Sequence, residues 1–200
     1  MRNIILKSAV ALALGVPLVA GAESAFTTGA TTPLTASARV DFTIVIPKFV
    51  SLRVGTSGAG IDLITFTVPA ASVGAGGAGI AGTGGDLTAG VVTARVLGNN
   101  GQVTLTSTAT GALSNGVGDT IPFTEITTVA SVLTSATALP APVLTNGTSA
   151  GVLATLTGTK ITNQDARWTY NYANTNVVAS GTYGGVNVNA GRVTYTASMP

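Results

Sequence analysis

The segment that most constrains the fold of this chain is Ala38–Pro47, in which apolar residues alternate with mostly polar ones. Successive side chains of a β-strand point to opposite faces, so the pattern predicts a strand with one apolar and one mostly polar face. The apolar face comprises Ala38, Val40, Phe42, Ile44 and Ile46. Pro47 ends the strand because it has no N–H to donate. An unpaired apolar strand promotes aggregation, so this one must either close the sheet of its own domain or pair with a neighbouring subunit.

Residues 1–22 are predicted to be a signal peptide for export. Arg2 and Lys7 provide a positively charged start, and a short apolar run follows at Ser8–Val19. Ala20–Ala22 has the small residues of a cleavage site, so the mature chain is expected to begin immediately after it. No later stretch has the length and hydropathy expected of a membrane span.

The charge of the mature chain is balanced. Removing the signal peptide takes two of the 9 basic residues and leaves 7, which equals the 7 acidic residues. A neutral chain with no basic patch is not expected to bind nucleic acid or a membrane surface. Only 8% of the residues are charged, and a surface with so little charge favours association with other molecules.

Cysteine and histidine are both absent. Their absence excludes Cys–His and Ser–His nucleophile pairs and most zinc, copper and haem sites. We therefore expect no enzyme activity, no cofactor and no metal. An exported protein without disulfides must derive its stability from its core or from assembly.

The rest of the chain is predicted to be all-β. Short runs rich in Thr and Val alternate with Gly, Asn and Pro, whereas no segment shows a sustained helical period. Strands are expected at Phe49–Val54, Ile61–Val68, Val91–Leu97, Gln102–Thr108, Ile121–Thr128, Val152–Ile161, Arg167–Ala173, Arg192–Ser198 and, more weakly, Tyr183–Val188. Asn99–Gly101 is predicted to be a tight hairpin turn because Asn and Gly tolerate positive φ. Such a series of strands favours a β-sandwich.

Three polar or glycine-rich patterns resemble functional motifs. Gly74–Gly79 matches G-x-G-x-x-G, but a dinucleotide site needs a helix directly after it, and more Gly, Ala and Thr follow here. We interpret it as a surface loop. The acidic residues are scattered without the clustering of a calcium site or a glycosidase pair. Asn163–Asp165 could supply oxygen ligands but is more typical of a turn.

Trp168, Tyr170 and Tyr172 alternate on one predicted strand and therefore share a face. An exposed row of this kind would be a platform for carbohydrate, which makes a self-complete secreted adhesin or carbohydrate-binding module the alternative function. A buried row would form part of the core. The chain has few other large side chains, which favours the core.

The arrangement of these segments resembles the alpha-type (class 5, colonisation-factor) chaperone–usher pilins. The likeness lies in the alternating strand with Pro47 and the second short strand Val50–Leu52, in the middle segment Asn99–Leu105 followed by Ile121–Pro122, and in the C-terminal segment. That last segment contains Ser180–Val186 and an alternating final strand close to the chain end.

The resemblance implies an immunoglobulin-like β-sandwich that lacks one strand. Residues 23–47 would be the N-terminal extension with the donor strand, and residues 48–200 the pilin domain. The apolar face that begins at Ala38 would fill the groove of an identical subunit, head to tail, in an extracellular filament serving adhesion or biofilm formation. A periplasmic chaperone and an outer-membrane usher are the further partners that the resemblance implies.

Overall fold

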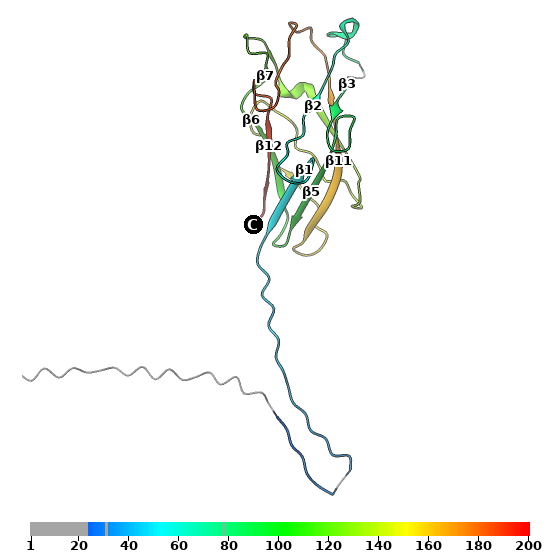
Figure 1. Cartoon of the computed structure of the whole chain (residues 1–200), viewed down its shortest axis with the longest axis vertical. Helices are drawn as coiled ribbons and strands as arrows, with labels where there is room; N and C mark the ends of the chain where they lie inside the picture. The colour runs from blue at the N-terminus through cyan, green and yellow to red at the C-terminus, as the bar shows by residue number, and fades with distance from the viewer. Residues whose placement is uncertain (1–23, 31, 78) are drawn as a thin grey trace, which may run out of the picture. The chain divides into compact units, whose positions relative to one another are not determined.

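The computed structural model describes residues 24–30, 32–77 and 79–200. Internal contacts divide the chain into two units, with the boundary between Ile46 and Pro47. The described residues before Pro47 form no helix or strand (Figure 1). Their side chains are exposed. The predicted signal peptide lies outside the described residues.

The unit from Pro47 to Pro200 is built of β-strands and two short 3-10 turns, so the predicted all-β class is confirmed. The strands are β1 (Val50–Val54), β2 (Ile64–Thr65), β3 (Ile80–Ala81), β4 (Thr83–Gly84), β5 (Val91–Gly98), β6 (Thr104–Ala109), β7 (Leu113–Ser114), β8 (Thr120–Ile121), β9 (Ile126–Ser131), β10 (Val152–Leu153), β11 (Thr162–Tyr172) and β12 (Val193–Ser198). The turns are Ala70–Ser72 and Phe123–Glu125.

The larger sheet has five strands, and all its pairs are antiparallel. β5 lies between β1 and β11, with Leu52 opposite Val96 and Trp168 opposite Val92. β9 pairs with the other edge of β11. β3 pairs with the last two residues of β11, whose other edge pairs with β9. It therefore lies on the same side of β11 as β5, beyond the end of β5.

The smaller sheet has three strands in the order β10, β6, β12. Leu105 of β6 lies opposite Val152 on one side and Ala197 on the other. Two separate two-stranded pairs, β2 with β4 and β7 with β8, lie outside both sheets. These pairs are short, so most of the remaining chain between strands is irregular.

Both sheets contribute side chains to one hydrophobic core. In β5 and β11 the alternate residues Val92, Val96 and Trp168 are almost fully buried, as the period of a strand requires. β6 adds Leu105, and the loops add residues such as Leu139 and Leu144. Since only a few of the core side chains are aromatic, much of this core is built from Val, Leu and Ala.

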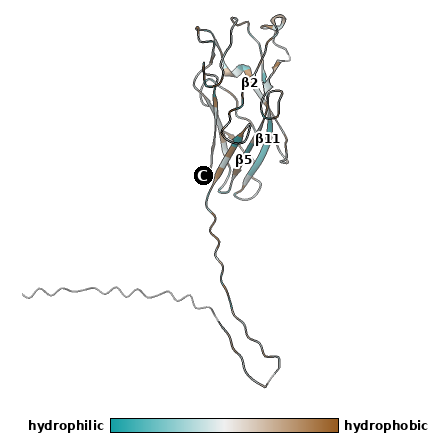
Figure 2. Ribbon diagram, viewed as in Figure 1, coloured by the Kyte–Doolittle hydropathy of each residue, from teal (hydrophilic) through white to brown (hydrophobic). Residues whose placement is uncertain are grey.

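β11 is longer than its sequence pattern predicts. It begins at Thr162, five residues before the predicted start, so Asn163–Asp165 belongs to a strand and not to a turn. These polar residues give much of β11 a hydrophilic colour in Figure 2. Gln164 and Asp165 are nonetheless buried. Their partners lie in distant loops, which the local sequence does not reveal.

The segment Asn99–Gly101 is not the predicted hairpin turn. It follows β5 of the larger sheet and leads to β6 of the smaller one, so the two strands that flank it never pair. Gly101 does adopt a positive φ of 134°. The Asn-Gly signal therefore identified the reversal, but it did not specify which sheet the next strand joins.

Four further predicted strands are interrupted, shortened or absent. Only Ile64–Thr65 of Ile61–Val68 forms a strand. Ile121–Thr128 is divided because Pro122 starts a 3-10 turn, after which β9 begins. Only Val152–Leu153 of Val152–Ile161 pairs within a sheet. Tyr183–Val188 contains no strand.

Candidate functional site

The predicted opening strand, Ala38–Ile46, is present as an exposed segment. No strand is assigned to the described residues before Val50. The apolar face is open to solvent, since Phe42 exposes 87% and Ile44 85% of its surface, and Ala38, Val40 and Ile46 are also exposed. A contiguous row of exposed apolar side chains marks a surface that binds another protein or aggregates. Within the described residues this row has no partner strand.

β1 has one paired and one unpaired edge. Its residues pair with β5, and no other described strand pairs with it. Gly55, which directly follows β1, donates its N–H to the Thr93 carbonyl oxygen of β5 at 2.7 Å. Main-chain groups of alternate residues face the same neighbour in an antiparallel ladder. The N–H and C=O groups of Val50, Leu52 and Val54 therefore face the unpaired edge.

β12 also has an unpaired edge, because β6 is its only partner among the described strands. β1 and β12 belong to different sheets, but they lie close to each other (Figure 1). A Cβ on Gly98 would lie 2.9 Å from Met199 Sδ and 3.8 Å from the Phe49 carbonyl oxygen, so the start of β1 and the chain end after β12 are neighbours. Two strands that each have an unpaired edge are thus adjacent without pairing.

The inward side chains of these two strands are only partly buried. Leu52 and Val54 of β1 and Val193, Tyr195 and Ala197 of β12 pack against the core but stay partly accessible. In contrast, Val92 and Val96 of the central strand β5 are almost fully buried. The core is therefore less well covered at β1 and β12 than at β5.

The aromatic row lies inside the protein. Trp168 is fully buried, and Tyr170 and Tyr172 expose less than a tenth of their surface. Trp168 Nε1 donates to the Leu139 carbonyl oxygen at 2.9 Å, and its ring centroid lies 5.2 Å from that of Tyr195. These side chains belong to the core, so the exposed platform considered for carbohydrate is not formed by them.

The carboxylates bind nearby main-chain and side-chain groups. Asp62 accepts the Thr56 N–H at 2.6 Å, and Asp86 accepts the Thr93 N–H at 2.7 Å while pairing with Arg53 at 3.1 Å. Asp119 accepts a hydrogen bond from the Asn115 side chain, and Glu125 accepts the Thr175 N–H. No three potential metal ligands of the His, Cys, Asp or Glu type come together in the part of the chain that the structure describes.

Asp165 and Gln164 hold the loop that follows β9. The Asp165 carboxylate accepts N–H groups from Thr134 at 2.9 Å and Ser135 at 2.8 Å, and also the Thr134 hydroxyl. Burial acts to raise the pKa of Asp165, but these hydrogen bonds outweigh it and lower the pKa from 3.8 to about 2. Gln164 Nε2 donates to the Thr137 and Ala138 carbonyl oxygens. Neither role could be predicted from the local sequence, because both depend on a loop about 30 residues away.

The glycine-rich segment that begins at Gly74 leads into strands β3 and β4 and not into a helix. Gly82 and Gly90 are buried, and a Cβ on Gly82 would lie 3.0 Å from Gly90 Cα. Two backbones therefore approach each other here as closely as glycine allows. Both of these glycines lie after the G-x-G-x-x-G motif, and the helix that a dinucleotide site requires is absent from the described residues that follow the motif.

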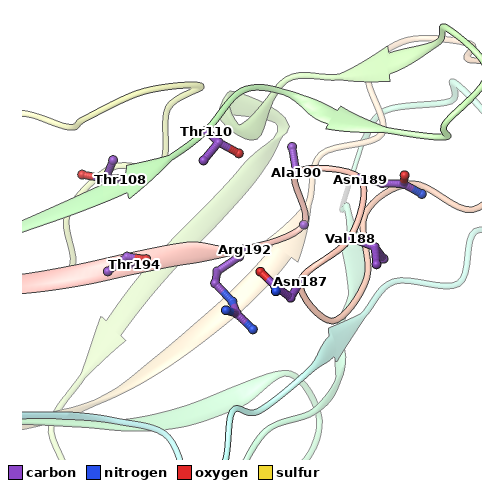
Figure 3. A pocket seen from close by; sticks show the side chains of 9 residues that line it. Thr108, Thr110, Asn187, Val188, Asn189, Ala190, Arg192 and Thr194 are labelled. Atoms are coloured by element: carbon purple, nitrogen blue, oxygen red, sulfur yellow. The ribbon is translucent and has the colours of Figure 1, made fainter.

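A hollow of about 210 Å³ lies where the loop 187–191 meets β6 and β12. Thr108, Thr110, Asn187, Val188, Asn189, Ala190, Gly191, Arg192 and Thr194 line it. In Figure 3 the Arg192 and Asn187 side chains lie next to each other, Arg192 directly before strand β12 and Asn187 farther back in the loop that leads to it. The lining contains neither a carboxylate nor an aromatic ring. This set supplies no acid–base pair and no stacking surface for a sugar.

None of the protein families, curated proteins or solved structures compared with this chain matches it. None of the helical segments in the described part of the chain has the length and hydropathy that crossing a membrane requires. The exposed segment and the two unpaired edges are therefore the features of the described residues that bear on function.

Proposed function

We propose that the protein is a structural subunit of an extracellular filament that polymerises by donor-strand complementation. In this proposal the unit from Pro47 to Pro200 is an immunoglobulin-like β-sandwich that lacks one strand between β1 and β12. The segment Ala38–Ile46 of one subunit supplies that strand to the next. We call this segment the donor segment and the region between the two unpaired edges the acceptor groove.

One observation carries the proposal: an exposed alternating segment that pairs with no described strand occurs in a chain whose domain has two neighbouring strands, β1 and β12, each with an unpaired edge. The donor segment spans nine residues, roughly 27 Å when extended. This is longer than the six residues of β12, so it can follow the whole acceptor edge. Its apolar face would cover side chains such as Leu52 and Tyr195, which are partly accessible.

The energetics favour a persistent interface. Burial of a Val, Ile or Phe side chain contributes roughly 1.5–3 kcal/mol, and the donor segment offers four large apolar side chains as well as Ala38. An added strand also gives the unpaired main-chain groups of β1 and β12 hydrogen-bond partners. Because donor and acceptor are different surfaces, the contact is head to tail and propagates into a filament without closing.

The remaining parts of the proposal rest on the resemblance to chaperone–usher pilins. A periplasmic chaperone would cover the acceptor groove before assembly, and an outer-membrane usher would export the subunit. Adhesion or biofilm formation is the biological role. The filament subunit would need no cofactor and would catalyse no reaction.

The carbohydrate-binding alternative depends on an exposed aromatic surface. Trp168 is fully buried and Tyr170 bonds Tyr195 in the core. No observation on the described residues favours this function over the filament.

A truncated protein that lacks residues 23–46 tests the proposal. We expect it to be exported, to form no filaments and to bind a synthetic peptide spanning residues 35–47. The full mature chain should form filaments visible by electron microscopy and a ladder on denaturing gels that disappears on boiling. A full mature chain that stays monomeric at high concentration and does not bind the peptide would exclude the filament function.

A further inference from the structure

We propose that Asn99 is a positioning residue that prevents the donor segment from pairing with β1 of its own domain. This inference rests on the proposed function, because it explains how a subunit with both a donor segment and an acceptor groove avoids filling its own groove. Two features account for this role: the main-chain groups that Asn99 binds, and the edge of β1 to which those groups point.

The Asn99 side chain binds the main chain on both sides of Lys48. Its Nδ2 donates to the Pro47 carbonyl oxygen at 2.8 Å, and its Oδ1 accepts the Phe49 N–H at 2.9 Å. One amide therefore makes the two hydrogen bonds that a peptide group of a neighbouring strand would make. The tripeptide 47–49 is tied at both ends to the residue that follows β5.

These two bonds extend the ladder between β1 and β5. The Gly55 N–H points to β5, so by alternation the main-chain groups of Arg53, Ser51, Phe49 and Pro47 point to the same side. Asn99 comes directly after Gly98, the residue of β5 that pairs with Val50. The Asn99 side chain thus adds one more pair of hydrogen bonds to the ladder between β1 and β5. These bonds hold residues 47–49 in line with β1.

Self-pairing would require a return turn at this tripeptide. The first residue of β1 that presents its main chain to the unpaired edge is Val50. A hairpin that pairs the whole of β1 through a short turn therefore closes at Val50. A two-residue turn would pair Val50 with Pro47, which has no N–H and whose carbonyl oxygen is bound to Asn99. A three-residue turn would use residues 47–49 as its loop, and Asn99 binds the first and last of them.

Both short turns therefore require the two Asn99 bonds to break. Exposed neutral hydrogen bonds of this kind stabilise only modestly, so loss of both should raise the self-paired population on the order of tenfold. Pairing with another subunit leaves the bonds in place, because a donor segment that extends away from its own β1 needs no turn. Asn99 thus favours pairing in trans.

Asn100 provides a matched control in the same turn. Its Nδ2 donates to the Pro200 carbonyl oxygen at 2.7 Å, and its N–H faces Met199 Sδ at 3.2 Å. It therefore holds the C-terminal end of the domain and touches no residue of the tripeptide 47–49 in these contacts. Asn100→Ala removes an amide from this turn without releasing Pro47 or Phe49.

The test is trypsin cleavage after Arg39, within the exposed donor segment, in full mature chains held as dilute monomers. The wild-type monomer and Asn100→Ala should be cut rapidly. Asn99→Ala should be cut more slowly, by at most about tenfold, and should polymerise more slowly, because its donor segment pairs more often with its own β1. Trp168 fluorescence checks that each monomer is folded.

Asn99→Asp is the second variant, and it is used for the same cleavage measurement if Asn99→Ala does not fold. Its carboxylate still accepts the Phe49 N–H but cannot donate to Pro47, so an intermediate cleavage rate is expected. Cleavage of both Asn99 variants at the wild-type rate would overturn the inference while leaving filament assembly intact. Protection of Arg39 in the wild-type monomer would instead contradict the proposed function itself, since the donor segment would then already be paired.

Discussion

The hydroxyl oxygens of Tyr170 on β11 and Tyr195 on β12 lie 2.8 Å apart, and their hydrogen bond joins the larger sheet to the smaller one. Trp168 packs against the same tyrosine, with ring centroids 5.2 Å apart. Tyr195 is also one of the partly accessible side chains of β12, beside the proposed acceptor groove. The contact between the sheets therefore reaches the site where we propose that the donor segment binds.

Tyr195→Phe should destabilise the subunit by about 1–3 kcal/mol, because it leaves the buried Tyr170 hydroxyl without a partner. The double variant with Tyr170→Phe should recover part of that loss, since it removes both polar groups together. Urea unfolding of the two single variants and the double variant measures the coupling. Additive losses in the three variants would show that the hydrogen bond does not stabilise the fold.

Stability should fall at alkaline pH. Burial raises the pKa of Tyr195 from 10.0 to about 12, against a smaller lowering by the hydrogen bond from Tyr170. Burial and the neighbouring Tyr195 raise the pKa of Tyr170 well above 10.0. Above pH 10 the unfolded chain releases these protons before the folded one, so stability is complete below pH 10 and declines as the pH approaches 12. Urea unfolding from pH 8 to 11 measures this decline, which Tyr195→Phe should reduce.

Asp165→Asn should destabilise the protein by about 1–2 kcal/mol, because the carboxylate binds Thr134 and Ser135. The pKa of Asp165 is lowered to about 2, so its contribution is present above pH 3.8 and is lost as the pH falls through 2. The variant should therefore show a smaller loss of stability between pH 4 and 2 than the wild type. Equal acid profiles would mean that the carboxylate charge does not hold this loop.

Gly90→Ala should destabilise the protein by about 1–3 kcal/mol. Gly90 has a φ of 74°, and an added Cβ would lie 2.8 Å from Gly82 Cα. Both the backbone conformation and the close approach disfavour a side chain. Gly111→Ala is the control, since it meets no heavy atom within 4 Å and should change stability by less than about 0.5 kcal/mol. Thermal unfolding of the two variants distinguishes them.

The strands that the sequence predicts best are those whose local alternation of residue types matches their burial. β1, β5 and β12 start and end within one residue of their predicted bounds, because alternation of Val and Leu with polar residues matches their burial. β11 was predicted too short because Gln164 and Asp165 are buried by contacts with a loop about 30 residues away. Local periodicity carries no information on such contacts.

The candidate site was predictable in part. Alternation identifies the apolar face of the donor segment, since it depends only on the period of a strand. The acceptor edges could not be predicted, because they follow from β1 and β12 lying in different sheets. The same limit applies to Asn99, which the sequence places in a hairpin and the structure places against Pro47 and Phe49.

Phe42→Asp in the donor segment should impair assembly far more than Thr43→Asp. In an extended strand, Phe42 lies on the face with Val40 and Ile44, and Thr43 lies on the opposite face. The two variants add the same charge at adjacent positions, but only the first would bury an unpaired carboxylate in the acceptor groove, at a cost of several kcal/mol. A loss of about 3 kcal/mol corresponds to roughly hundredfold weaker pairing. Competition of the two variant peptides with the wild-type peptide 35–47 for the truncated protein measures the difference directly. Equal affinities would show that the donor segment does not insert its alternate side chains into the groove.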